Sequence, residues 1–318
     1  AFVTTFPGTL RFGGGTHNLG ATSGITGTGS MLLALGTVNL SGTYNVTSTN
    51  ITSGRFTFQP AGRGVMRTKA LNFGGSTNAW VGRLDLTDDS MIIDYDLFSP
   101  VAQVRNQLHQ GHSNGWTGDG IVSSSAAADH TKAIGYLDTA TNPRSIFAGQ
   151  SVDSTSVLLG YTYFGDADLD GDADGVDIGT WATNFTGELG GTGTMVWTQG
   201  DWDYDGDVDG VDAGLWAQAF TGELGGGGLG NLVVDNPNIA PGAAAILRGM
   251  GIAVVPEPAL LAPFGLALAT YSLRSRKHRR ERMESNPPPR RWFIYRRAAV
   301  FESSVIVWAG QPQLSAVD

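Results

Sequence analysis

Two acidic runs repeat one another 35 residues apart, and this internal duplication constrains the fold more than any other feature. Residues 165–191 read GDADLDGDADGVDIGTWATNFTGELGG, and residues 200–226 read GDWDYDGDVDGVDAGLWAQAFTGELGG. The copies differ at 7 of 27 positions, so both are expected to fold as the same unit. Each run places six aspartates within twelve residues. Their mutual repulsion is most simply relieved by a bound divalent cation.

The spacing of the aspartates is that of a calcium loop with oxygen ligands. In each copy, carboxylates stand at loop positions 1, 3, 5, 7, 9 and 12, and a glycine stands at position 6, where the loop must turn sharply. Position 7 is expected to offer its carbonyl, position 9 a water-mediated contact and position 12 a bidentate carboxylate. The predicted ligands are Asp166, Asp168, Asp170, Asp172, Asp174 and Asp177, then Asp201, Asp203, Asp205, Asp207, Asp209 and Asp212. We therefore expect two Ca²⁺ ions per chain.

A short amphipathic helix is predicted after each loop. Apolar residues recur at i, i+3, i+4 and i+7, namely Ile178, Trp181, Ala182 and Phe185, then Ala213, Trp216, Ala217 and Phe220. Gly187 and Gly222 are expected to end these helices. The two aromatic faces are expected to pack on each other as a compact pair with a loop at each pole, and a strand-like segment is predicted before each loop.

Residues 165–226 resemble a type I dockerin module, whose tandem loop-helix repeats carry Asp at loop position 12. The resemblance implies an all-α, EF-hand-like pair that depends on calcium and docks on cohesin domains, often as part of a polysaccharide-degrading enzyme. Positions 10 and 11 hold Gly175-Val176 and Gly210-Val211, where many cohesin-binding dockerins have a Ser/Thr pair. The implied metal role carries over, and the partner stays open between a cohesin-like domain and a surface glycan.

Residues 1–84 are predicted to be a Gly/Thr-rich β-repeat region. Polar and apolar residues alternate over 37–40 and 55–58, which indicates short strands separated by Gly-Ser-Thr turns. The stretch 40–56 resembles strand repeats of autotransporter-type passenger domains. The expected fold class is therefore mainly β, as a β-solenoid or a sandwich-like region.

Residues 85–164 are predicted to form a small α+β segment that closes the sheet. Ser99-Pro100 is expected to start a helix as N-cap and first helical residue. The helix continues through Val104 and Leu108 to a C-cap at Gly111.

The C-terminal part is predicted to contain a sorting signal. A linker over 227–254, with a short helix at 243–247, leads to Val255-Pro256-Glu257-Pro258, the uncharged run 259–273 and a basic cluster up to Arg280. The order over 255–280 resembles the PEP-CTERM signal. It implies an exosortase-type processing enzyme and transient anchoring in the membrane through a hydrophobic helix at 259–273. Residues 281–318 are expected to be a basic, disordered tail.

Charge and residue usage exclude several functions. The net charge is −9, and the excess acid before residue 274 argues against nucleic acid as a partner. The chain has no Cys, so a disulfide scaffold, a thiolate zinc site and a Cys nucleophile are excluded. His109 and His112 are the one close histidine pair and are expected on the surface. Asp88, Asp89, Asp94 and Asp96 are interpreted as solvated turns at strand ends rather than glycosidase carboxylates.

These features together predict a non-catalytic bacterial protein that is exported to the cell surface, outer envelope or matrix. Its calcium-stabilised dockerin-like module would serve interaction, and the C-terminal signal would direct sorting. The alternative is the C-terminal part of a polysaccharide-degrading enzyme whose catalytic domain lies upstream of Ala1.

Overall fold

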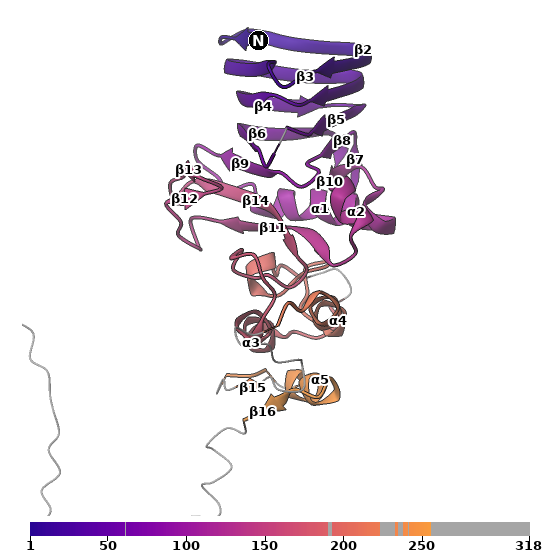
Figure 1. The fold of residues 1–318 in the computed structure, drawn as a ribbon, viewed down its shortest axis with the longest axis vertical. Coiled ribbons are helices and arrows are strands. Elements are labelled where there is room, and N and C mark those ends of the chain that lie inside the picture. Colours follow the sequence, from indigo (N-terminus) through magenta and orange to yellow (C-terminus); the bar gives the residue numbers. More distant parts are fainter. Residues whose placement is uncertain (61, 190–192, 223–232, 235–237, 241, 256–318) are drawn as a thin grey trace, which may run out of the picture. The chain divides into compact units, whose positions relative to one another are not determined.

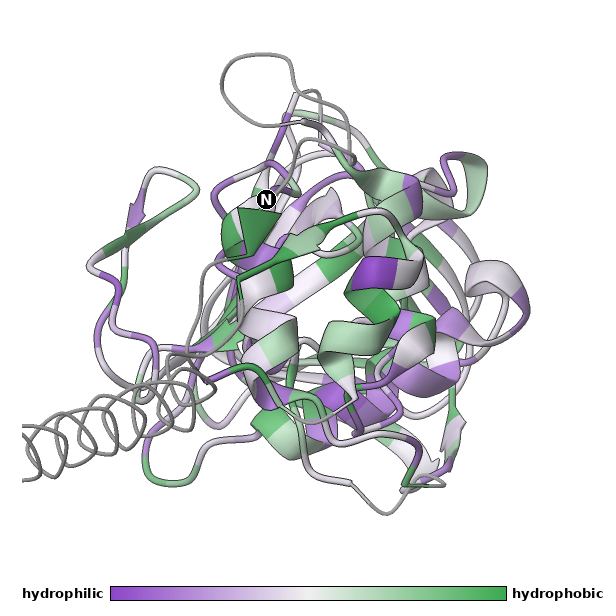
Figure 2. Ribbon diagram, turned by 90° about the horizontal axis from the view of Figure 1, so that it is seen from below, coloured by the Kyte–Doolittle hydropathy of each residue, from purple (hydrophilic) through white to green (hydrophobic). Residues whose placement is uncertain are grey.

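Strands that pair in parallel stack on one another through residues 1–122 (Figure 1). The structure, a computed structural model, describes residues 1–255 except 61, 190–192, 223–232, 235–237 and 241. Its main sheet has 12 strands, and seen from below the successive turns of the chain overlap around a common centre (Figure 2). The strands are β1 (Phe2–Thr4), β2 (Thr9–Leu19), β3 (Gly24–Leu40), β4 (Thr43–Ile51), β5 (Arg55–Phe58), β6 (Val65–Ser76), β7 (Ala79–Val81), β8 (Arg83–Asp85), β9 (Ser90–Asp94), β10 (Gly120–Val122), β11 (Lys132–Asp138) and β14 (Ser156–Tyr163). The prediction of a mainly β chain is confirmed.

The strand order shows that the chain winds round repeatedly, so that each turn lays its strands in parallel alongside those of the turn before. The sheet runs β10-β8-β5-β3-β4-β6-β9-β14-β11, with β1 and β2 on β3, and β7 on β6. The 17-residue strand β3 pairs with β4 through its first part and with β5 through its last residues. From β1 to β10, every pairing is parallel apart from the β6–β7 hairpin. The parallel pairing differs from that of immunoglobulin-type sandwiches, whose sheets are antiparallel.

The parallel register builds the core as columns of apolar side chains. One column joins Ile25, Tyr44, Met66 and Met91 in successive strands, and each residue is at most 2% exposed. Alternate residues of a strand point to opposite faces, so the period-2 pattern places one face of every coil inside. Each buried side chain of this size contributes about 1.5–3 kcal/mol to folding.

The antiparallel strands β14 and β11 extend the main sheet beyond β9. The same part of the chain forms the helices α1 (Val101–Trp116) and α2 (Ser124–Ala128) and a separate hairpin of β12 (Ile146–Phe147) with β13 (Gln150–Ser151). Helix α1 begins directly after Pro100, and the Val101 N–H donates to Ser99 Oγ at 3.2 Å. The predicted C-cap at Gly111 is wrong. Gly111 lies inside the helix, where a Cβ atom would come within 1.8 Å of the Ile121 carbonyl oxygen, so the glycine allows α1 to approach β10.

The duplicated runs form two loops, each followed by a helix, α3 (Gly175–Asn184) or α4 (Gly210–Ala219). Both helices end before the predicted glycines, with Phe185 and Phe220 as C-caps. Gly187 and Gly222 lie beyond the helices with φ of 71° and 96°. Strand β14 precedes the first loop as predicted, but a 3₁₀ turn, η1 (Trp197–Gln199), precedes the second.

The core of this module continues into the β region. Trp197, Trp202 and Tyr204 are at most 1% exposed and belong to the same hydrophobic cluster as the strand columns. The Tyr204 hydroxyl donates to the Ile134 carbonyl of β11 at 3.1 Å. The described residues accordingly fall within one compact unit, Ala1–Pro258.

The predicted linker contains ordered elements. Helix α5 (Ala243–Gly249) is present where a short helix was expected, and β15 (Val233–Val234) pairs in parallel with β16 (Ala253–Val254). The predicted sorting signal 255–280, apart from Val255, and the predicted tail 281–318 lie outside the described residues. Within the described part, no helix is long and apolar enough to cross a membrane.

Candidate metal centres

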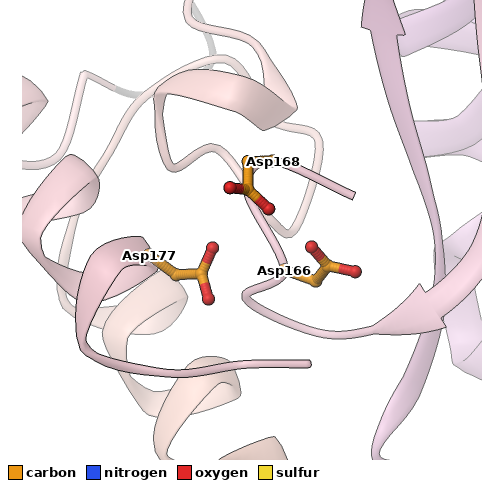
Figure 3. Close-up of side chains that lie close together, drawn as sticks. All are labelled: Asp166, Asp168 and Asp177. Atoms are coloured by element: carbon orange, nitrogen blue, oxygen red, sulfur yellow. The ribbon is translucent and has the colours of Figure 1, made fainter. Parts of the chain in front are cut away.

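Each loop brings together the carboxylates of positions 1, 3 and 12. In the first loop, ligand atoms of Asp166, Asp168 and Asp177 lie within 4.8 Å of one another (Figure 3). Asp201, Asp203 and Asp212 form the same group in the second loop. The first two carboxylates precede the turn and the third comes from the first turn of the following helix. The local fold therefore gathers carboxylates that are eleven residues apart.

The remaining predicted ligands are placed differently. Positions 7 and 9 form a second acidic group with the position-12 carboxylate: Asp172, Asp174 and Asp177 in the first loop, and Asp207, Asp209 and Asp212 in the second. The position-9 side chains also cap the helices, since they accept from the N–H groups of Val176 at 2.7 Å and Val211 at 2.6 Å. Asp170 at position 5 lies in none of the acidic groups found among the described residues. Asp205 groups with Asp207 and with Glu188, which was not predicted.

A backbone turn at positions 4 and 6 gives the loops their shape. Gly171 and Gly206 have φ of 103° and 98°, as predicted for position 6. Position 4 is also left-handed, with φ of 59° at Leu169 and 70° at Tyr204. Such a conformation costs a non-glycine residue about 1–3 kcal/mol and is common at ligand sites.

The position-12 carboxylates are held with both oxygens facing their loops. Asp177 accepts from the N–H groups of Ala167 and Asp174, both at 2.8 Å. Asp212 likewise accepts from Trp202 at 2.7 Å and Asp209 at 2.9 Å. Because each oxygen is oriented separately, the side chain is prepared for the bidentate role predicted from its spacing.

Hydrogen bonds connect each repeat to the loop of the other. The indole N–H of Trp181 donates to the Asp209 carbonyl at 2.8 Å, and that of Trp216 donates to the Asp174 carbonyl at 3.0 Å. Position 8 of each loop also pairs with a threonine that follows the other helix. The Val208 N–H donates to Thr186 Oγ1 and the Thr186 N–H donates to the Val208 carbonyl, both at 2.9 Å. In the other pair, the Ala173 N–H donates to Thr221 Oγ1 at 3.0 Å and the Thr221 N–H donates to the Ala173 carbonyl at 3.1 Å. The tryptophans were predicted only as apolar residues, and the threonines were not singled out.

Burial raises the pKa of most clustered carboxyls. Burial is the main reason that the pKa is raised to about 8 for Asp177 and Asp212 and to about 6 for Asp166. Burial and the charge of Asp212 raise the pKa of Asp201 to about 9. Gathering these groups in their ionised form is therefore unfavourable unless a cation neutralises them.

Other predicted residues have structural roles. His112 is not a surface residue, because its ring packs against Trp116, Phe164 and Tyr204 at 5.0–5.6 Å, whereas His109 is exposed. Asp89 is 1% exposed rather than solvated, and its carboxylate accepts from the Gly64 N–H and the Thr87 hydroxyl. Asp94 and Asp96 pair with basic side chains of β6, those of Arg67 and Lys69.

Comparison with family models, curated proteins and solved structures gives no match for this chain.

Proposed function

We propose that residues 165–222 bind two Ca²⁺ ions as a dockerin-like EF-hand pair in an exported, non-catalytic surface or matrix protein. The observation that carries the proposal is the convergence of loop positions 1, 3 and 12 in both repeats. The same local geometry arises twice although the segments before the loops differ, a strand in one case and a 3₁₀ turn in the other.

The chemistry of the side chains favours calcium among the common metals. The clustered groups are carboxylates, which are hard oxygen ligands that suit Ca²⁺, Mg²⁺ and Mn²⁺, whereas Zn²⁺ and Cu ions prefer sites with nitrogen or sulfur. Calcium accepts 6–8 oxygens in flexible geometry, and magnesium demands a near-ideal octahedron. A loop of six aspartates with backbone carbonyls supplies many oxygens and little rigidity.

The buried Asp201 supports a ligand role directly. Its side chain is 0% exposed, and neither carboxylate oxygen has a hydrogen-bond partner among the described residues. A buried carboxylate in this state is destabilising unless it meets a positive charge. Arg105 supplies part of that charge, with its Nη1 atom 4.0 Å from Oδ2, and a cation shared with Asp203 and Asp212 would supply the rest.

The remainder of the proposal concerns the setting of the module. We assign the parallel stack to a β-solenoid that serves as a stalk or adhesive region, followed by the sorting segment 255–280. Val176 and Val211, both at loop position 11, are 66% and 53% exposed. These equivalent apolar residues are the surface that we expect a protein partner to contact.

Titration calorimetry on the full chain tests the metal role. We expect two Ca²⁺ per chain for the natural protein, and one each for Asp177→Asn and Asp212→Asn, because Asn offers a single neutral oxygen. The control Asp96→Ala removes an exposed carboxylate that pairs with Lys69 outside the loops and should still bind two. Absence of binding at millimolar Ca²⁺ would contradict the proposal.

A further inference from the structure

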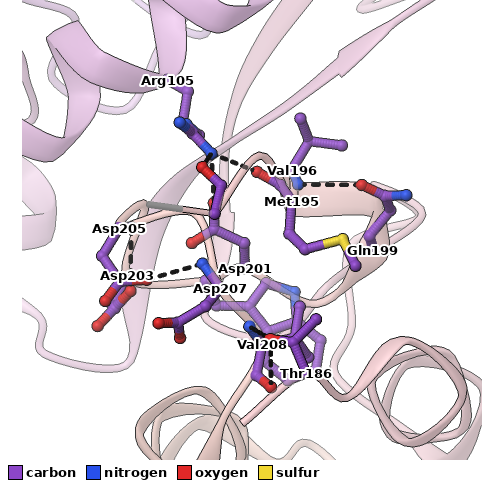
Figure 4. A network of polar contacts seen from close by, with 12 residues as sticks. Arg105, Thr186, Met195, Val196, Gln199, Asp201, Asp203, Asp205, Asp207 and Val208 are labelled. Carbon is purple, nitrogen blue, oxygen red and sulfur yellow. Dashed lines mark hydrogen bonds and ion pairs between the residues drawn. The ribbon is translucent and has the colours of Figure 1, made fainter. Parts of the chain in front are cut away.

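Helix α1 places a buried guanidinium against the second loop (Figure 4). The Arg105 side chain is 17% exposed, and its Nη1 atom lies 4.0 Å from Oδ2 of Asp201, the carboxylate at loop position 1. The same nitrogen donates to the carbonyl oxygens of Met195 at 2.8 Å and Gly193 at 3.2 Å. These carbonyls hold the charge next to the loop.

The first loop satisfies its position-1 carboxylate with neutral donors. Asp166 accepts from the N–H groups of Asp170 at 3.1 Å and Gly171 at 3.0 Å, and from the Thr162 hydroxyl. Thr162 stands four residues before Asp166, and the residue four before Asp201 is Trp197, whose indole N–H donates to the Asp166 carbonyl. The duplication therefore did not carry over the hydroxyl partner, and the guanidinium of Arg105 lies beside Asp201 instead.

We infer that Arg105 lowers the calcium affinity of the second loop below that of the first, so that the two ions bind in order. This inference rests on the proposed function. Ligand charge tunes the affinity of calcium loops, and a cation coordinated by Asp201 would lie roughly 6 Å from the guanidinium, given Ca–O distances near 2.4 Å. Even in a water-like dielectric, a unit charge at that distance changes the binding of a divalent ion by about tenfold.

The arginine at the first loop does not have this effect to the same degree. Arg144 donates to the backbone carbonyl of Asp168, but its side chain is exposed. Solvent and salt screen an exposed charge, whereas Arg105 is mostly buried. The electrostatic environments of the two loops therefore differ although their sequences are nearly the same.

A purely structural role for Arg105 predicts a change of opposite sign. Loss of its bonds to Gly193 and Met195 would loosen the second loop and weaken calcium binding. Loss of its charge would strengthen binding. Arg105→Gln keeps a donor for one carbonyl and removes the charge, and Arg105→Lys keeps the charge.

The test is calorimetry on the full chain carrying Asp177→Asn, so that only the second loop binds calcium. We expect Arg105→Gln to raise the Ca²⁺ affinity about tenfold and Arg105→Lys to leave it within about twofold. The matched control, Arg144→Gln on the Asp212→Asn chain, should change the first loop by less than about twofold. An unchanged or weaker affinity in Arg105→Gln overturns the inference.

A second comparison needs no change at Arg105. The chain with only the second loop (Asp177→Asn) should bind Ca²⁺ more weakly than the chain with only the first loop (Asp212→Asn). Equal affinities, or a tighter second loop, also overturn the inference while leaving the proposed function intact. If neither loop of the natural protein binds Ca²⁺, the proposed function itself fails.

Discussion

The indole nitrogen of Trp181, in the first repeat, donates a 2.8 Å hydrogen bond to the carbonyl oxygen of Asp209, in the loop of the second repeat. Trp216 makes the reciprocal bond to Asp174 at 3.0 Å. Both indoles are fully buried. Each helix therefore supports the loop that belongs to the other helix, at the residue that caps the next helix and occupies ligand position 9.

Because each indole bonds to the loop of the other repeat, substitution of a tryptophan is predicted to weaken calcium binding by the loop of the other repeat. Trp181→Phe keeps the ring packing and removes the hydrogen bond, worth about 1 kcal/mol, so the second loop should bind Ca²⁺ about fivefold more weakly. Trp216→Phe should weaken the first loop instead. Calorimetry on the two single-loop chains measures each effect, with Trp80→Phe as a control outside the repeats. A larger effect on the loop of the same repeat would contradict the crosswise support.

Alanine substitution of the two position-6 glycines is predicted to lower the free energy of unfolding by different amounts. Gly171 and Gly206 share φ near 100°, so alanine is strained at both, by about 1–2 kcal/mol. At Gly171 a Cβ atom meets nothing within 4 Å, but at Gly206 it would lie 2.4 Å from Arg105 Nη1 and 2.6 Å from the Gly193 carbonyl oxygen. Denaturant unfolding should therefore show a larger loss of unfolding free energy for Gly206→Ala than for Gly171→Ala. Equal losses would contradict the prediction that these two contacts crowd a side chain at position 206.

Calcium binding is predicted to release protons near neutral pH. In the metal-free chain the pKa of Asp177 and Asp212 is about 8 and that of Asp201 about 9, so these groups carry protons at pH 7 that a bound cation must displace. Calorimetry in buffers of different ionisation enthalpy should detect proton release at pH 7 and much less at pH 9.5.

The same raised pKa values set the pH dependence of the metal-free fold. The folded chain binds these protons more tightly than the unfolded chain, whose Asp pKa is about 3.9. Their contribution is present below that value and is lost as the pH rises through about 8–9. Thermal unfolding of calcium-free protein should occur at a lower temperature at pH 9 than at pH 7, and added calcium should reverse the loss. A metal-free fold that gains stability over this range would contradict the prediction.

The buried His112 is predicted to give the fold the opposite pH dependence, in which stability is lost as the pH falls. Burial and, secondarily, the charge of His109 lower its pKa to about 4, so its contribution to stability is present above the unfolded value of about 6.5 and is lost as the pH falls towards 4. His112→Gln should flatten the decline in unfolding free energy between pH 6.5 and 4. His109→Gln, at an exposed position, removes only the secondary cause and should change the slope much less than His112→Gln does. Equal slopes for all three proteins would rule out the role of His112.

Local spacing was enough to predict which carboxylates of one loop lie close together. Position 12 reaches position 1 because eleven residues with a left-handed glycine fold back on themselves, and the helix that follows orients the carboxylate. The strand pattern of residues 37–40 and 55–58 was readable for a similar reason, since alternation follows from the geometry of a single strand. The direction of pairing was not readable, because it depends on which distant strand lies alongside.

The sequence by itself determined the two acidic loops, their ligand spacing, the glycine turns, the helices that follow and the mainly β character of the remainder. Only the tertiary structure decided that Arg105 faces Asp201, that the tryptophans bond across the repeats and that Tyr204 joins the module to β11. Residues 105 and 201 are separated by almost a hundred positions, and no local propensity relates them. Their contact exists because burial of a shared apolar core brings α1, β11 and the second loop together, and that burial depends on the whole chain.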